Sequence, residues 1–186
     1  EEGRGTLITA GILPGRGRVV GIAANSHALP CKFSGDQTEL DLLLGRLEDA
    51  SLSWTDLQLS SPTEALGPVT AQLVLDTRNS PEHRQFLLQL ESDLAPASRL
   101  EVHWGHASVT AVGEGIAERT SCWSIARETL NDLGITPLSL NGSSHGITAL
   151  VPRESLDSIL RSWHQAFPGL RDSNAGISPV PTKDLS

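Results

Sequence analysis

Apolar side chains recur at helical spacing in four stretches of the chain. Most neighbours within a stretch stand three or four positions apart, which places them on one face of an α-helix. The four sets are Leu40, Leu43, Leu44 and Leu47; Phe86, Leu87, Leu90 and Leu94; Cys122, Ala126, Leu130 and Leu133; and Leu156, Ile159, Leu160, Trp163 and Phe167. The pattern predicts four amphipathic helices whose apolar stripes face a core.

Residues at the ends of these stretches predict where the helices begin and end. Thr38, with Asp41 three positions later, nearly matches a capping box before the first helix, with Asp in place of Glu or Gln. Ser80 followed by Pro81 predicts the N-cap and the first helical position of the second helix. Gly134 predicts the end of the third helix, because glycine readily adopts the left-handed conformation found there.

Short runs of apolar and β-branched residues between the helices predict strands. The clearest run is Val69–Leu75, whose alternation predicts a strand with one buried face. The other predicted strands cover residues 18–24, 28–33, 55–59, 100–104, 107–113, 136–140 and 146–151. In chain order the elements are a strand, then βαββαβ, then βαββα.

This order predicts an α+β fold of two ferredoxin-like βαββαβ units. Residues 28–104 form a complete unit. Residues 107–167 form the same unit without its last strand, and the strand at 18–24 can supply it. The first unit is then inserted in the chain path of the second.

Composition and charge indicate a globular protein and argue against some classes of binding partner. The chain has 186 residues, of which 38% are hydrophobic and 19% charged, which is typical of a folded globular protein. With 22 acidic and 14 basic side chains its net charge is −8, so neither nucleic acid nor an anionic membrane is expected as a main partner. No apolar run approaches the roughly 20 residues of a membrane helix, and there is no signal peptide.

The cysteines and the first residue add two expectations. Cys31 and Cys122 stand alone without CxxC spacing, so we expect no disulfide framework, no structural zinc site and a cytoplasmic location. The chain contains no methionine and begins at Glu1, so we expect it to be a fragment of a larger protein.

One motif has the spelling of a hydrolase nucleophile elbow. Gly142-Ser-Ser-His-Gly146 fits G-x-S-x-G, which would make Ser144 a nucleophile. That chemistry requires a strand–turn–helix, whereas here the motif joins two predicted strands. We therefore interpret it as a polar β-turn or a ligand-facing loop, with a hydrolase through Ser144 as the alternative.

A second glycine motif resembles a dinucleotide-binding loop only in part. Gly113-Glu-Gly115 follows a predicted strand and precedes a predicted helix, but Glu118 stands where the third glycine belongs. A carboxylate there would repel pyrophosphate. The glycines instead predict a tight turn whose free N–H groups could receive a small anion.

The histidines do not predict a metal centre. His103 and His106 stand three apart around Trp104 and Gly105, but no third or fourth ligand accompanies them. We expect no catalytic residues and no metal in this segment.

Several segments together resemble a known regulatory module. They are Ala107–Gly113, Leu133–His145, Ala149–Leu156 and Leu160–Phe167, with a further segment at Gly5–Thr9. The first four resemble the second unit of the tandem ACT-domain regulatory region of aspartate kinases, and Gly5–Thr9 resembles the end of that family's kinase domain. The resemblance covers about residues 5 to 167.

The resemblance implies a division of the chain. Residues 1–17 would be a remnant of the kinase domain and a linker, 28–104 the first ACT unit, 18–24 plus 105–167 the second, and 168–186 a tail or linker. The kinase domain, which uses ATP and magnesium to phosphorylate aspartate, would precede this segment, and no cofactor is expected within it.

The resemblance also implies a partner and a site. An end-product amino acid, lysine or threonine, would bind at an ACT–ACT interface of a homodimer and control the kinase. The implied effector-binding residues are Ser34, Gly35, Asp36, Gln37, Thr38, Asp56, Ser60 and Ser61. The implied interface loop is Asn141, Gly142, Ser143 and Ser144.

Within that set, residues 34–38 would hold the effector carboxylate at a helix N-terminus, and Asp56 would pair with its ammonium group. This loop is shorter than the family's, and the charge of Asp36 disfavours a carboxylate nearby. The alternative is therefore an effector-blind ACT scaffold that serves only dimerisation.

Overall fold

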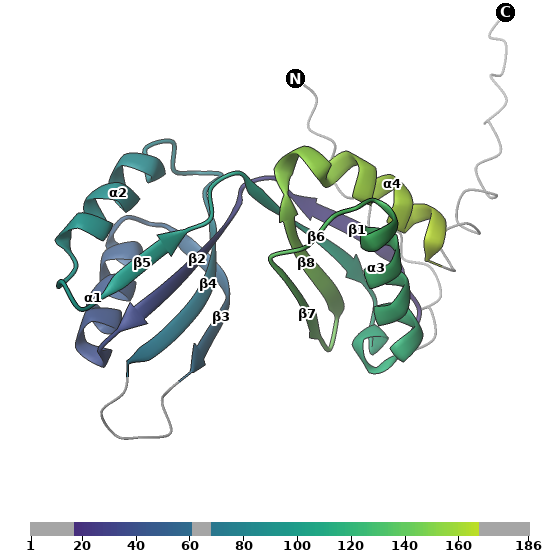
Figure 1. Cartoon of the computed structure of the whole chain (residues 1–186), viewed down its shortest axis with the longest axis horizontal. Coiled ribbons are helices and arrows are strands. Elements are labelled where there is room, and N and C mark those ends of the chain that lie inside the picture. The colour runs from purple at the N-terminus through teal and green to yellow at the C-terminus, as the bar shows by residue number, and fades with distance from the viewer. Residues whose placement is uncertain (1–16, 61–67, 168–186) are drawn as a thin grey trace, which may run out of the picture.

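Two four-stranded antiparallel sheets, each covered on one side by two helices, make up the described part of the chain. The structure is a computed structural model, and it describes residues 17–60 and 68–167. The helices lie on the outer sides and the two sheets face each other between them (Figure 1). None of the helices in these ranges is long and apolar enough to cross a membrane.

The first sheet has the strand order β3-β4-β2-β5. Its unit comprises β2 (Ala28–Gly35), α1 (Gln37–Asp49), β3 (Ser53–Ser60), β4 (Val69–Asp76), α2 (His83–Asp93) and β5 (Arg99–Val102). Alternate side chains of β2 and β4 pack against the predicted leucine stripes of α1 and α2. This core contains Leu29, Cys31, Phe33, Leu40, Leu43, Leu47, Ala71, Leu73, Leu75, Leu87 and Leu90.

The second sheet has the order β1-β6-β8-β7. Its unit comprises β1 (Gly21–Asn25), β6 (His106–Val112), α3 (Thr120–Asp132), β7 (Ser139–Ser143), β8 (Gly146–Pro152) and α4 (Leu156–Ala166), with short 3₁₀ turns at Ile116–Glu118 and Arg153–Ser155. Strand β1 pairs with β6 from Gly21↔Val112 to Asn25↔Ser108. The N-terminal strand therefore completes the second unit, and the predicted fold class, with one unit inserted in the other, is confirmed.

The predicted starts of the first two helices are wrong. The N-cap of α1 is Asp36, whose carboxylate accepts from the N–H of Glu39 at 2.8 Å, so the helix begins before Thr38. Helix α2 begins at His83 after Glu82, and it is the backbone carbonyl of Ser80, not its side chain, that accepts from the N–H of His83. The polar residue that follows directly on the end of β2 becomes the cap, because the chain must turn there.

The predicted end of α3 and the predicted start of β7 had different outcomes. Gly134 has φ +68 directly after the C-cap Leu133, the left-handed position expected of it. Strand β7 starts at Ser139 rather than at Thr136. Pro137, which lacks an N–H, delays the start of strand pairing.

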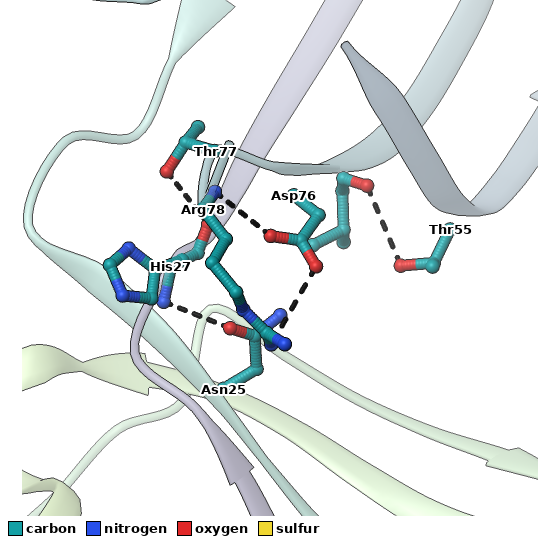
Figure 2. Close-up of polar contacts among 7 residues, drawn as sticks. Asn25, His27, Thr55, Asp76, Thr77 and Arg78 are labelled. Carbon is teal, nitrogen blue, oxygen red and sulfur yellow. Dashed lines mark hydrogen bonds and ion pairs between the residues drawn. The ribbon is translucent and has the colours of Figure 1, made fainter. Parts of the chain in front are cut away.

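The two units are joined by two connections, and hydrogen bonds anchor both of them. Between β1 and β2 the chain turns at His27, whose carbonyl accepts from both the N–H and the hydroxyl of Thr77, at 3.1 and 3.0 Å (Figure 2). Asn25 accepts from the N–H of His27 at 3.0 Å. Thr77 is only 6% exposed, so it stabilises the junction from inside the protein.

The open faces of the two sheets, which carry no helices, meet at a small apolar contact. Ala28, Val74 and Leu150 form this contact, and all three are buried. Because Ala28 and Val74 belong to the first sheet and Leu150 to the second, this contact links the two open faces.

Candidate functional site

The predicted effector loop lies where β2 ends and α1 begins. Ser34 and Ser60 stand in one row across the sheet, because both are paired with Thr70 of the strand between them. Asp36 places its own carboxylate on the first turn of α1. The N-terminal N–H groups of this helix are thus partly used by an acidic side chain of the chain itself, which disfavours an incoming carboxylate.

Asp56 lies away from this loop. It stands four residues before Ser60 on β3, a separation of about 13 Å along a strand. Of the predicted effector-binding residues, the structure thus brings Ser34 and Ser60 to one end of the sheet and places Asp56 nearer the other. Ser61, like residues 1–16 and 168–186, lies outside the described residues.

Asp56 occupies an irregular point of β3. The register of β3 against β4 shifts between Thr55 and Gln58, so one extra residue is inserted, and Asp56 has φ +55. For a residue other than glycine this left-handed backbone costs about 1–3 kcal/mol, and such outliers concentrate at functional sites. The bulge turns Leu57 towards the core and leaves Asp56 and Gln58 on the open face of the sheet.

The open face of the first sheet forms one wall of a cavity of about 260 Å³. From the first unit, the polar side chains that line this inter-sheet cavity are Lys32, Asp56, Gln58, Gln72, Glu101 and His103. Gln58, Gln72, Lys32 and Glu101 form a single row in register across all four strands. Since side chains alternate along a strand, this row projects from the face opposite the helices.

The second sheet supplies the other wall of the inter-sheet cavity. Leu138 lines it just before β7, Ser139 and Asn141 line it from β7, and Leu150 lines it from β8. The amide of Asn141 donates to the hydroxyl of Ser139 at 3.2 Å. The structure therefore brings together one residue of the predicted effector set, Asp56, and one of the predicted interface loop, Asn141.

The other residues of the predicted interface loop do not line the cavity. Gly142 lies against Trp123, and a Cβ added there would stand 2.5 Å from the indole ring. Ser143 and Ser144 belong to the hairpin between β7 and β8. Ser144 contacts His145, Oγ to Nδ1 2.7 Å, in a turn between strands rather than at a helix start, so the nucleophile-elbow geometry is not formed.

The Gly113–Gly115 turn has no free N–H groups at its two glycines. Gly113 donates to the carbonyl of His145 at 2.9 Å, and Gly115 donates to the carbonyl of Ser144 at 2.8 Å. The prediction that these N–H groups are free to receive an anion is therefore wrong. The hairpin and the turn hold each other in place.

His103 and His106 do approach each other but form no metal centre in the described ranges. Their rings are in edge-to-face contact with centroids 5.9 Å apart, and Nε2 of His103 lies 3.7 Å from Oε1 of Glu101. Across residues 17–60 and 68–167, no three His, Cys, Asp or Glu side chains gather closely enough to hold a metal ion.

Sequence reasoning missed most of the cavity lining. The available signal was a polar residue between buried neighbours, as at Lys32 between Cys31 and Phe33. This alternation indicates a strand with one solvent-facing side. That a second sheet stands opposite that side is not visible in the pattern.

Solved structures similar to this chain include aspartate kinases and their regulatory subunits. The regulatory subunit of aspartate kinase from Thermus flavus matches at a TM-score of 0.64 and 18% identity, over 80% of this chain and 98% of that one. Aspartate kinase from Clostridium acetobutylicum matches at a TM-score of 0.65 and 14% identity, over 85% of this chain and 37% of that one. E. coli aspartokinase III, in complex with lysine and aspartate, matches at a TM-score of 0.53 and 20% identity, over 79% of this chain and 32% of that one.

These likenesses establish the fold. The chain has the tandem ACT architecture of aspartokinase regulatory regions, and it spans nearly the whole of the isolated regulatory subunit but about a third of the complete kinases. No family model matches the sequence, and no curated protein matches it.

Proposed function

We propose that this chain is the regulatory region of an aspartate kinase. In this proposal it binds an end-product amino acid, lysine or threonine, at an ACT–ACT interface and thereby controls the phosphorylation of aspartate by a kinase domain of the same protein. The observation that carries the proposal is the shared tandem architecture, in which one unit is inserted in the other, over 80% of this chain and 98% of a regulatory subunit.

The arrangement of the two units suits a regulatory role. They are separate cores joined by two chain connections and by the small apolar contact of Ala28, Val74 and Leu150. A contact of this size leaves relative motion of the units inexpensive. A ligand that prefers one arrangement shifts the population towards it, which is the requirement for allosteric control.

The proposed effector-binding residues are Ser34, Gly35, Asp36, Gln37, Thr38 and Ser60 at one end of the first sheet, Asp56 on the open face of β3, and Ser61 beyond the described part. Strands β3 and β5 are the edges of the first sheet, and β1 and β7 are those of the second. Exposed edge strands can pair with a second copy, which supports the proposed homodimer.

One observation favours a second candidate, an effector-blind scaffold that only builds the dimer. Asp36 caps α1 with its own carboxylate, so the helix N-terminus that would hold the effector carboxylate already carries a negative group. In this alternative the ACT pair contributes dimer contacts and no ligand response.

Calorimetry and thermal unfolding with lysine and with threonine separate the two candidates. A ligand that binds only the folded chain stabilises it by RT ln(1 + [L]/Kd), about 2.7 kcal/mol at a hundredfold excess over Kd. We expect heat and a raised midpoint with at least one of the two amino acids. Dimerisation in sedimentation experiments without heat or a shift would support the scaffold and overturn the sensor.

A further inference from the structure

We infer that the β7–β8 hairpin and the segment that enters β1 are coupled through the turn between β6 and α3, so that a displacement of either one moves the other. The entry segment is residues 17–20, and the β6–α3 turn is residues 113–119. The inference rests on the proposed function for its regulatory meaning, because there a kinase domain precedes the entry segment and the hairpin carries the implied interface loop. The turn is then the path by which a change at that interface reaches the kinase domain.

Backbone hydrogen bonds hold the entry segment against the second unit. The N–H of Gly17 donates to the carbonyl of Glu114 at 2.6 Å, and the N–H of Val20 donates to the carbonyl of Val112 at 2.7 Å. Val19, between them, is only 2% exposed and belongs to the core of the second unit. The entry segment is therefore held at both of its ends and in its middle.

The entry segment and the turn are in direct backbone contact at Gly113. A Cβ at this position would overlap the carbonyl oxygen of Arg18, which is backbone and cannot rotate away. Gly17 has φ +87, and a Cβ there would overlap the guanidinium of Arg119. Backbone-to-backbone contact leaves no flexible side chain to absorb a shift, so a movement of the turn displaces the entry segment.

The turn is tied to the hairpin through the same glycine. The N–H of Gly113 donates to the carbonyl of His145 at 2.9 Å, and the N–H of Gly115 donates to the carbonyl of Ser144 at 2.8 Å. Gly115 has φ +66, in the left-handed region that favours glycine. Gly113 thus contacts the hairpin through its N–H and the entry segment through its Cα.

A further contact between the hairpin and the turn lies at Gly142. A Cβ at this position would stand 2.5 Å from the ring of Trp123 and 2.9 Å from the Cβ of Ala117. The indole N–H of Trp123 donates to the carbonyl of Ala117 at 2.7 Å, which keeps the ring in place. A displacement of the hairpin at Gly142 therefore presses directly on the turn and on the start of α3.

The position of β1 in its sheet makes the entry segment responsive to the turn. Strand β1 is an edge strand and pairs only with β6, so it has one neighbour where a central strand has two. Elements with fewer contacts open at a lower free energy than the core of the sheet. A shift of the turn is thus expected to move the entry segment before it disturbs the β6–β8 pairing.

The test is amide hydrogen exchange on the whole chain. Gly142→Ala presses the hairpin against the turn, and it should speed exchange at the amides of Gly17 and Val20 tenfold or more. Gly45→Ala, the same substitution in α1 with open space around the Cβ, should change neither amide. Ile159→Val loosens the core of the second unit from α4, and it should speed these two amides no more than those of the β6–β8 ladder.

A variant at the other end tests the coupling in reverse. Gly17→Ala places a Cβ against Arg119, and it should speed exchange at the amides of Gly113 and Gly115, which donate to the hairpin. Coupling between two sites is reciprocal, so both directions must respond. If Gly142→Ala and Gly17→Ala each speed exchange only at their own end, the hairpin and the entry segment are independent and the inference is overturned.

Exchange with lysine or threonine present separates this inference from the proposed function. An amino acid that gives heat in calorimetry should also change the exchange rates at Gly17 and Val20 about fivefold or more, which is the size of a modest allosteric coupling. Heat without such a change overturns the path to the kinase domain and leaves the sensor standing. No heat with either amino acid overturns the sensor, whereas the two glycine variants still decide whether the hairpin and the entry segment are coupled.

Discussion

The hydroxyl of Thr77 donates a hydrogen bond to the carbonyl of His27, Oγ1 to O 3.0 Å, at the junction of the two units. Thr77 follows β4 of the first unit, and His27 lies on the turn that leaves β1 of the second. The same carbonyl also accepts from the N–H of Thr77 at 3.1 Å. One buried residue thus ties the end of a central strand to the connection between the units.

Replacing Thr77 by valine should remove the hydroxyl while keeping the side-chain shape. The carbonyl of His27 keeps its backbone donor, so the expected loss of unfolding free energy is about 1 kcal/mol, that of one net hydrogen bond. Urea denaturation measures the change. Thr77→Ser retains the hydroxyl and should lose less, and equal losses in the two variants would show that the methyl group matters instead.

Gly113→Ala should destabilise the second unit. A Cβ at this position would stand 2.2 Å from the carbonyl oxygen of Arg18 and 2.8 Å from Ile116, so the backbone must shift, at about 1–3 kcal/mol. Gly45→Ala is the matched control. Gly45 lies inside α1 with open space around a Cβ, so alanine should stabilise by about 0.5–1 kcal/mol. If the denaturation midpoints of Gly113→Ala and Gly45→Ala move in the same direction, the close approach at Gly113 does not determine its effect.

Asp36→Ala should destabilise the chain by about 1 kcal/mol, because it removes the side-chain acceptor that caps α1. Asp36→Asn keeps a capping oxygen and should change stability little. Thermal unfolding of the two variants tests the cap. Thr38→Ala should have a smaller effect than Asp36→Ala, and the reverse order would restore Thr38 as the N-cap.

The thiol of Cys31 should be unreactive in the folded chain at neutral pH. Burial raises its pKa from 9.0 to about 12, and the side chain is only 3% exposed. Labelling with a thiol reagent should therefore be slow until the chain unfolds. Rapid labelling of Cys31 under native conditions would contradict the buried position.

The same pKa shift makes stability depend on alkaline pH. The folded-state pKa of Cys31 lies above that of the unfolded chain, so the contribution is complete below pH 9.0 and is lost as the pH rises towards about 12. Between these values the unfolded chain ionises while the folded chain stays protonated. Cys31→Ala should remove this part of the pH dependence in denaturant titrations.

Asp93 should titrate below its usual range. A hydrogen bond from Arg46, at 2.7 Å, and one from Gln89 lower the pKa of its carboxyl. A lowered folded-state pKa stabilises the fold above the unfolded value, and this contribution is lost as the pH falls through the folded value. Arg46→Met should raise the pKa of Asp93 in an NMR titration. If the pKa of Asp93 is unchanged in this variant, the hydrogen bond between Arg46 of α1 and Asp93 of α2 does not lower it.

Local periodicity was sufficient to predict the helices and their buried faces. Leu40, Leu43 and Leu47 are buried on α1, as their spacing indicates, and so are Ile159 and Trp163 on α4. A stripe of this kind must be buried wherever the helix docks, so it does not depend on the partner. The same holds for the alternating strand at Val69–Leu75.

The exact helix starts were less predictable. Asp36 and Thr38 are both good N-cap residues, and only the point where β2 stops at Gly35 decides between them. A Cβ at Gly35 would stand 2.3 Å from Ser98. The close approach of a distant segment thus sets the end of the strand and, with it, the cap.

For the candidate site as well, some features follow from the local sequence pattern and others depend on the packing of the two sheets. Local pattern alone was enough to predict the strands at 28–33 and 55–59 that carry Lys32 and Asp56, because alternation along a strand is a local property. That these two side chains line one cavity with Glu101 and Asn141 follows from the packing of the two sheets. Strand order, the bulge at Asp56 and the approach of the two open faces depend on contacts between residues far apart in the chain, and no local pattern encodes those.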